Sequence, residues 1–151
     1  MNTLARILLV EDNPHDEEMT LDAFAECRLA NEVVVVRDGQ EALDYLLHQG
    51  DYTDRQCGNP AVILLDLKLP KISGMEVLRR LKSDPELKTI PVVIMTSSRE
   101  ERDVAEGYAL GVNAYVVKPL EFSRFVEAVK DLGVFWALVN HPPLGSVNRS
   151  V

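Results

Sequence analysis

Length, composition and charge already restrict what this chain can be. Its 151 residues, 46% of them hydrophobic, suffice for one compact domain, which we expect over residues 1–140, with an irregular tail over 141–151. Acidic residues outnumber basic ones by 24 to 16, giving a formal net charge of -8, so no basic surface is available to neutralise nucleic acid phosphates. The sequence shows no signal peptide and no apolar run near the roughly 18 residues needed to span a bilayer. We therefore expect a cytoplasmic protein that binds neither nucleic acid nor membrane.

Strand-like and helix-like segments alternate five times along the chain. The runs at 7–10, 62–65 and 92–95 are apolar at every position, which is typical of parallel strands covered by helices on both faces. Helix starts follow, at Asn13-Pro14 and in the capping-box spacing of Ser73 and Glu76. The alternation predicts an α/β fold with a doubly wound, five-stranded parallel sheet. The predicted strands span residues 5–10, 33–37, 61–66, 91–96 and 113–118.

Two other segments depart from this regular pattern. Residues 48–60 form a polar, turn-rich connection, which we expect to be mobile and to lie at the end of the sheet away from the acidic residues described next. Residues 99–109 predict a polar helix with few apolar residues, further weakened by Gly107. A loosely held helix of this kind suits a surface that changes conformation.

Charged residues stand where three of the strands end. Glu11 and Asp12 follow the first strand, Asp66 closes the third and Lys118 closes the fifth. Because the carboxyl ends of parallel strands meet at one edge, three carboxylates and an ammonium should share a small crevice. Carboxylates that close repel one another and call for a divalent cation. Taken singly, each residue also has a plainer interpretation, such as a helix cap or turn for Asp66 and a surface ion pair for Lys118.

These charged residues, with Thr96 at the end of the fourth strand and Pro119 after Lys118, resemble the receiver domain of two-component response regulators, the CheY-like family. The resemblance covers residues 5 to about 138, and its matched positions stand at strand ends in the family's order. It implies a flavodoxin-like sheet with the strand order 2-1-3-4-5. It also implies a cis peptide bond between Lys118 and Pro119.

The resemblance gives each residue a role in phosphoryl transfer. Asp66 would be the nucleophile that accepts the phosphoryl group, while Lys118 and Thr96 would each donate to a phosphoryl oxygen. Thr96 and Tyr115 would form a switch in which the aromatic ring moves inward, unless Tyr115 is simply a static, half-buried strand residue. Mg²⁺ would be held by Glu11, Asp12, Asp66 and the backbone carbonyl of Lys68.

Lys68 is a departure from the family's pattern, which often has an uncharged or acidic residue there. Its ammonium could lean over the phosphoryl group and change the phosphoryl lifetime, or it could be an exposed cation that contributes only its carbonyl. A Mg-dependent phosphatase of the haloacid dehalogenase type is a distant alternative, because that class needs a second Asp at this position. A dinucleotide-binding module would need glycines at residues 11–14, and there are none. We expect a phosphoacceptor that catalyses only its own phosphorylation and dephosphorylation.

The implied partner is a sensor histidine kinase. Only residues 119–151 follow Lys118, too few for a separate output domain, so we expect the signal to leave through protein contacts. The loop at 48–60 and the apolar last helix resemble regulators paired with bacterial phytochromes, although another kinase or a phosphorelay stays open. The last helix lacks polar residues from 132 to 139, which predicts a homodimer, unless this segment packs on the chain's own long loop. The expected dimer residues are Phe135, Trp136, Leu138 and Val139.

Overall fold

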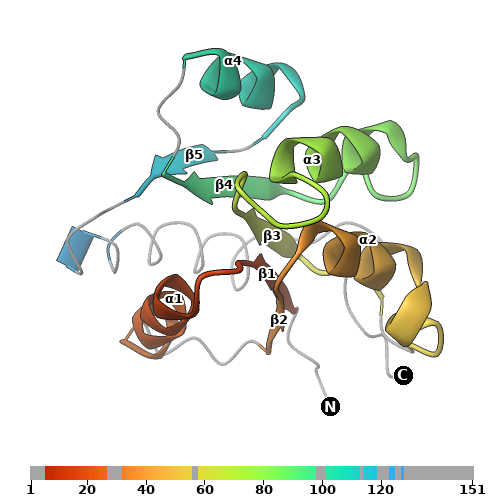
Figure 1. Cartoon of the computed structure of the whole chain (residues 1–151), viewed down its shortest axis with the longest axis horizontal. Coiled ribbons are helices and arrows are strands. Elements are labelled where there is room, and N and C mark those ends of the chain that lie inside the picture. Colours follow the sequence, from red (N-terminus) through yellow and green to blue (C-terminus); the bar gives the residue numbers. More distant parts are fainter. Residues whose placement is uncertain are drawn as a thin grey trace.

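One parallel sheet forms the centre of the molecule. The computed structural model describes residues 6–26, 32–55, 58–97, 101–112, 114–118, 123–124 and 127. The five strands within them lie in the order β2-β1-β3-β4-β5, which confirms the predicted topology (Figure 1). Each strand is one or two residues shorter than predicted. Their bounds are Ile7–Val10 for β1, Val33–Val36 for β2, Val62–Leu65 for β3, Val92–Thr96 for β4 and Ala114–Val117 for β5.

Short polar side chains fix the starts of three helices. The Asn13 carboxamide oxygen accepts the N–H groups of residues 15 and 16 at 2.9 and 3.2 Å. Asp38 and Ser73 accept the N–H groups of Glu41 and Glu76 in the same way, so the predicted cap at Ser73 is confirmed. The helices are α1 (Pro14–Glu26), α2 (Gly39–Leu47), α3 (Gly74–Ser83) and α4 (Glu101–Ala109), with a short 3-10 helix, η1 (Gly50–Tyr52).

Alternate strand residues face opposite sides of the sheet and build two apolar layers. On one side, Leu8 and Val10 pack in a cluster with residues of α2 and α3. On the other side, Ile7 and Leu9 pack with Phe24 of α1. Figure 1 shows α1 on the opposite side of the sheet from α2 and α3. Helices on both sides therefore make the sheet doubly wound, as its continuous apolar strands predict.

The connection at 48–60 packs closely on α2 where it is described. The Tyr52 ring meets Tyr45 edge-on with 5.1 Å between centroids, and its hydroxyl donates to Glu41 at 2.7 Å. The Arg55 guanidinium lies 4.1 Å from the centre of the Tyr45 ring. Since Glu41 is in the first turn of α2, part of this connection returns closer to the carboxyl end of the sheet than we expected.

Some predicted features lie outside the described residues. These are the Lys118–Pro119 peptide bond and the four expected dimer residues, Phe135, Trp136, Leu138 and Val139. Within the described part of the chain, no helix has the length and apolar character needed to cross a membrane.

Candidate phosphoryl-transfer site

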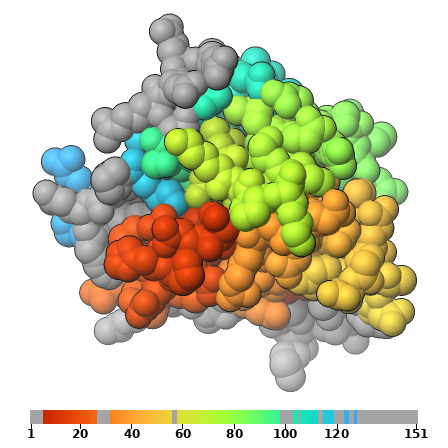
Figure 2. All heavy atoms as spheres, in the orientation of Figure 1, coloured from red at the N-terminus to blue at the C-terminus, as the bar shows by residue number. Residues whose placement is uncertain are grey.

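The carboxyl edge of the sheet places the predicted site residues. Beyond the ends of β1, β3 and β5, one further backbone N–H continues the ladder: Glu11 donates to Val36 at 3.0 Å, and Asp66 donates to Val10 at 3.1 Å. Lys118 donates to Thr96 in the same manner at 2.7 Å. The segments that follow β1 (red), β2 (orange) and β3 (yellow-green) adjoin on one face of the molecule in Figure 2. The sheet thus fixes the backbone positions of Glu11, Asp66 and Lys118.

Gly74 lets α3 begin directly beside the backbone of Asp66. A Cβ atom built at Gly74 would lie 2.0 Å from the Asp66 carbonyl oxygen, far inside van der Waals contact. The Gly74 N–H also donates to the carbonyl of Leu67 at 2.9 Å. Only glycine permits this close approach, which holds the turn after Asp66 against the start of α3.

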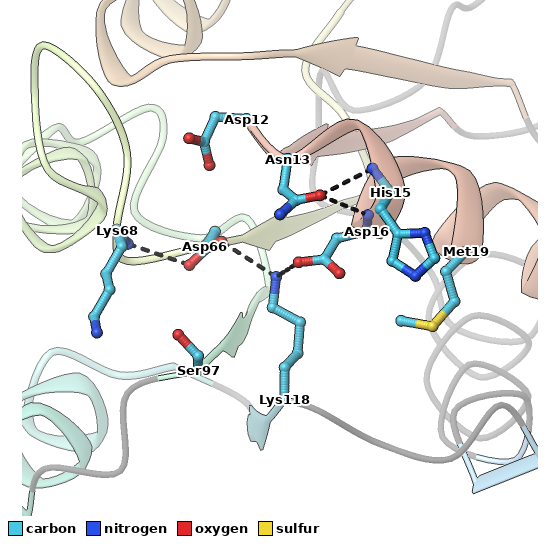
Figure 3. A pocket seen from close by; sticks show the side chains of 9 residues that line it. All are labelled: Asp12, Asn13, His15, Asp16, Met19, Asp66, Lys68, Ser97 and Lys118. Carbon is cyan, nitrogen blue, oxygen red and sulfur yellow. Dashed lines mark hydrogen bonds and ion pairs between the residues drawn. The ribbon is translucent and has the colours of Figure 1, made fainter.

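Lys118 is the centre of a buried charge cluster. Its ammonium donates to Glu11 Oε1 at 2.8 Å, to Asp16 Oδ2 at 2.8 Å and to Asp66 Oδ2 at 3.2 Å (Figure 3). The side chains of Lys118, Glu11 and Asp66 are only 8%, 4% and 9% exposed, whereas that of Asp16 is 24% exposed. An ammonium has three N–H donors, so these three carboxylates occupy all of them.

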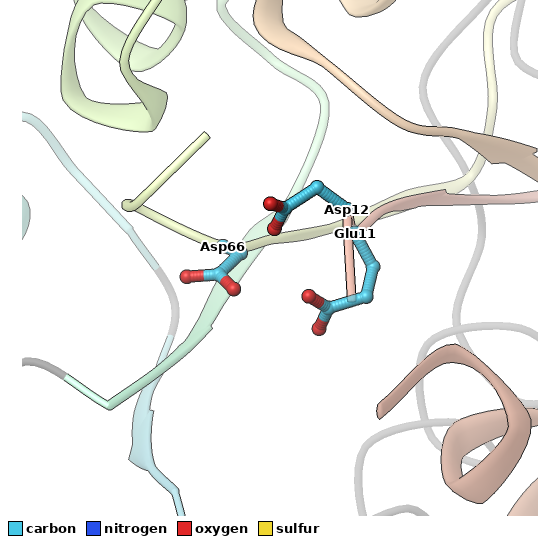
Figure 4. A group of neighbouring side chains, drawn as sticks. All are labelled: Glu11, Asp12 and Asp66. Carbon is cyan, nitrogen blue, oxygen red and sulfur yellow. The ribbon is translucent and has the colours of Figure 1, made fainter. Parts of the chain in front are cut away.

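Three acidic side chains form a group that could bind a metal ion. Glu11, Asp12 and Asp66 each offer one carboxylate oxygen, and these three atoms lie within 4.8 Å of one another. Figure 4 shows the three side chains. Asp12 is exposed and makes no hydrogen bond or ion pair with any described residue, so its carboxylate is available as a ligand. The donor set is entirely oxygen, which suits Mg²⁺ or Mn²⁺. One ammonium cannot balance the carboxylates gathered here, and a divalent cation would do so.

Burial and charge shift the protonation of two members of the cluster. Burial raises the pKa of the Glu11 carboxyl to about 7, outweighing the hydrogen bond and charge of Lys118, which act to lower it. Burial alone would lower the pKa of the Lys118 ammonium, but hydrogen bonds to Asp16 and Glu11 and the charge of Asp66 raise it above its usual value. Lys118 therefore stays cationic, while Glu11 can take up a proton near neutral pH.

A crevice of about 470 Å³ opens over this cluster. Of the predicted site residues, Asp12, Asp66, Lys68 and Lys118 line it, whereas Glu11 lies buried below. Thr96 is fully buried at the end of β4, and the neighbouring Ser97 lines the crevice in its place. The remaining lining residues are Asn13, His15, Asp16 and Met19. The structure therefore brings together Glu11, Asp12, Asp66 and Lys118, which directly follow β1, β3 and β5, as the strand-end pattern predicts.

Of the two residues expected to modulate the site, Lys68 lines the crevice, whereas Tyr115 packs in the core. The Lys68 backbone N–H donates to Asp66 Oδ1 at 3.2 Å, while its side chain is exposed at the crevice. Tyr115 is half-buried on β5 and packs against the core cluster on the α3 side of the sheet. A Cβ at Gly107 of α4 would come within 3.6 Å of the Tyr115 ring, so this helix runs close over it.

Asp16 and Ser97 are site residues that sequence reasoning did not identify. From the sequence, Asp16 is explained by the favourable interaction of an acidic residue with the positive end of the helix dipole. That explanation gives no reason to expect its ion pair with Lys118. The signal that could have found it is its position in the first turn of a helix that starts at the acidic edge. Ser97 directly follows Thr96 and could have been found from that adjacency.

The chain can be placed among known proteins. Residues 7–130 match the response regulator receiver domain family. Response regulator Rcp1 from Synechocystis sp. (strain ATCC 27184 / PCC 6803 / Kazusa) is 39% identical over 130 residues, which are 86% of this chain and 87% of that protein. The crystal structure of its Mn²⁺-bound form superposes with a TM-score of 0.83 at 37% identity, covering 92% of this chain and 99% of that one.

Two further solved structures are similar over nearly the whole chain. The phosphorylated cyanobacterial phytochrome response regulator RcpA gives a TM-score of 0.84 at 42% identity, covering 93% of this chain and 99% of that one. The bacteriophytochrome response regulator AtBRR gives 0.76 at 61% identity, covering 93% and 100%. The compared chains therefore have nearly the same extent as this one.

Proposed function

This chain belongs to the family of response regulator receiver domains, and we propose that it is a stand-alone phosphoacceptor which takes a phosphoryl group from a histidine kinase onto Asp66. The observation that carries the proposal is the contact of Lys118 with Asp66, 3.2 Å apart, beside the oxygen ligands of Glu11 and Asp12. Signalling would then proceed through contacts with other proteins. We accordingly propose that the protein acts in the cytoplasm.

Glu11, Asp12, Asp66 and the backbone carbonyl of Lys68 would hold Mg²⁺. When bound, the cation offsets the negative charge that an anionic phosphoryl group brings to an anionic carboxylate. The donor chemistry fits, since every side-chain ligand is a carboxylate and the Asp12 carboxylate forms no hydrogen bond or ion pair with the described residues. The solved Mn²⁺-bound form of the relative Rcp1 supports a divalent cation, and Mg²⁺ is our choice within that class.

The transfer itself is an in-line displacement on phosphorus. An Asp66 carboxylate oxygen forms the new P–O bond, while the P–N bond to the kinase histidine breaks and its electron pair stays on the imidazole nitrogen. Lys118 donates an N–H to a phosphoryl oxygen, and the Thr96 hydroxyl would donate to another. Inward movement of the Tyr115 ring would report the shift of Thr96. The protein would thereby catalyse its own phosphorylation, and water would later reverse it.

Labelling of Asp66 tests this function. We expect incorporation of phosphate from a small acyl phosphate in the presence of Mg²⁺, and its loss in Asp66→Asn or after chelation of the metal. Asp51→Asn, which removes an exposed carboxylate in η1, is the matched control and should be labelled like the wild type. Undiminished labelling of Asp66→Asn would show that another residue is the acceptor.

We propose further that the kinase is a bacterial phytochrome. The support is that RcpA and AtBRR, at 42% and 61% identity, are named as phytochrome and bacteriophytochrome response regulators. The kinase would contact the surface beside the crevice, where Pro14, Met19 and Leu69 offer apolar groups. A hollow of about 350 Å³ adjoins Met19 on α1.

Phosphotransfer profiling against all histidine kinases of the source organism would test the pairing. At short reaction times, the initial rate with a phytochrome kinase should exceed the rate with any other kinase. A faster rate with a kinase that lacks a phytochrome sensor would favour the alternative of another kinase or a phosphorelay, and the phosphoacceptor function would remain.

Homodimerisation through the last helix is the remaining part of the proposal. It rests on the sequence alone, through the apolar residues Phe135, Trp136, Leu138 and Val139. Sedimentation at tens of micromolar should show a dimer, and Trp136→Glu should shift it toward the monomer. A wild-type monomer, both with and without a phosphoryl mimic, would contradict the dimer.

A further inference from the structure

Asp16 contributes one of the two shortest contacts of the Lys118 ammonium, yet the phosphoryl-transfer function described above leaves it without a role. The contact, at 2.8 Å, matches that of the buried Glu11 and is shorter than the 3.2 Å contact of Asp66. It joins residues 102 positions apart in the sequence. Helix α1, which follows the first strand, thereby contacts a side chain that follows β5, the last strand.

The first turn of α1 is built so that Asp16 faces the crevice. The Asn13 side chain accepts the Asp16 N–H at 3.2 Å, and the Thr20 hydroxyl donates to the Asp16 carbonyl at 2.8 Å. Figure 3 shows the Asp16 carboxylate turned toward the Lys118 ammonium from this capped turn. The backbone of Asp16 is thus held on both sides, and its carboxylate is fixed over Lys118.

Phosphorylation changes only one of the three Lys118 partners, Asp66. Asp66 loses its charge when its oxygen becomes part of the acyl phosphate, and a phosphoryl oxygen becomes the better acceptor. Glu11 is 4% exposed, so water could not easily take the place of Lys118 at its Oε1 atom if Lys118 moved away. Asp16 keeps its charge and its capped position. The bond that Lys118 exchanges is therefore the one to Asp66, while Glu11 and Asp16 remain as anchors.

We propose that Asp16 is a positioning residue for phosphoryl transfer, which together with Glu11 fixes two N–H groups of Lys118 so that the third is aimed at the phosphoryl group on Asp66. The proposal rests on the phosphoacceptor function. A lysine side chain rotates about four bonds and locates its charge poorly when only one partner holds it. With two anchors, the ammonium is already in place when the phosphoryl group arrives.

Two substitutions that remove the same charge separate positioning from electrostatics. Asp16→Asn keeps an oxygen that can accept the Lys118 N–H, whereas Asp16→Ala keeps none. The measurement is the initial rate of Asp66 labelling from a small acyl phosphate with Mg²⁺, a step that breaks the donor's P–O bond and releases its carboxylate. We expect Asp16→Ala to react about tenfold more slowly than Asp16→Asn, the effect of losing one hydrogen bond to a charged group. Equal rates for the two variants would overturn the proposal.

Controls locate the effect at Lys118. Asp22→Asn and Asp22→Ala change an exposed carboxylate on the same helix and should react at equal rates. In a Lys118→Ala background, the contrast between Asn and Ala at residue 16 should vanish, and its persistence would contradict action through Lys118. If Asp16→Ala fails to fold by circular dichroism, Asp16→Leu replaces it, since Leu has the shape of Asn without its acceptor. An unlabelled wild type would refute the phosphoacceptor function, whereas a labelled wild type without the contrast would refute only the role of Asp16.

Discussion

Two clusters of opposite charges lie on this protein, and they differ mainly in their access to water. The buried cluster is Lys118 with Glu11, Asp16 and Asp66, and three of its four side chains are less than 10% exposed. The surface cluster is Arg79 and Arg80 of α3 with Glu76 and with Glu106 of α4, and its side chains are 40% to 55% exposed. Similar ion pairs therefore occur in two very different environments.

The difference teaches what burial does to an ion pair. On the surface, water solvates each partner nearly as well as the other partner does, so the pairs contribute little to stability. In the buried cluster, water replaces a lost partner poorly, so removing one charge leaves the others uncompensated. The buried cluster also contains the Glu11 carboxyl, whose pKa burial raises to about 7, and such shifted groups are frequent at functional sites.

The largest expected effect comes from removing the central cation of the buried cluster. Lys118→Met leaves Glu11 and Asp66 without their partner, and at pH 8 we expect the free energy of unfolding to fall by about 3–5 kcal/mol. Urea unfolding of the metal-free protein measures this change. Arg79→Met is the matched surface variant and should lose less than about 1 kcal/mol. Equal losses would mean that burial does not distinguish the clusters.

The pH dependence of stability should have opposite signs in the two clusters. The pKa of Glu11 is raised from 4.5 to about 7, so the folded protein holds that proton more tightly than the unfolded chain. The resulting stability is fully present below pH 4.5 and is lost as the pH rises through about 7, by up to about 3 kcal/mol. Glu76 behaves in the opposite way, because hydrogen bonds from Arg80 and Arg79 lower its pKa. Its stabilisation is present above its ordinary pKa and is lost in acid.

Urea unfolding of wild type and Glu11→Gln between pH 5 and 8, in the presence of a chelator, isolates the Glu11 contribution. The difference between the two proteins should change across this range in favour of the wild type at pH 5. Glu76→Gln provides the comparison for the surface cluster. A flat difference for Glu11→Gln would show that this carboxyl does not bind a proton near neutral pH.

The smallest expected effect is that of salt on the surface cluster. In 1 M NaCl, where charges are screened beyond about 3 Å, the stability difference between wild type and Arg79→Met should nearly disappear. The difference for Lys118→Met should persist, since ion pairs whose side chains are mostly buried are screened much less by salt. Unfolding of both variants at low and high salt tests this, and a salt-insensitive Arg79→Met difference would contradict the solvated picture of that cluster.

The strand ends made most of this architecture predictable. Continuous apolar runs predicted the parallel sheet. Glu11, Asp12, Asp66 and Lys118 were found because the carboxyl ends of parallel strands meet at one edge, although each residue taken singly has a plainer interpretation. The order of the strands came from the family resemblance, and it is confirmed. Local sequence therefore carries the positions, while the resemblance carries the topology.

Contacts that cross between elements could not be predicted in this way. Asp16 fits the preference for acidic residues at the start of a helix, so the local sequence does not indicate its hydrogen bond with Lys118. Tyr52 sits in a polar segment, yet it packs on Tyr45 and reaches Glu41. In both cases a residue satisfies a local preference and a distant partner at once, and only the first is visible in the sequence.

The buried cluster also has a consequence for the synthesis of the protein on the ribosome. Its three ion pairs join residues that are 52, 102 and 107 positions apart, and their shared partner, Lys118, directly follows β5, an edge strand of the sheet. A nascent chain that has released Glu11, Asp16 and Asp66 still carries their mutual repulsion until Lys118 leaves the exit tunnel. The ability to accept a phosphoryl group should therefore appear late in synthesis and abruptly. An incomplete nascent chain that lacks Lys118 should not be phosphorylated by the kinase.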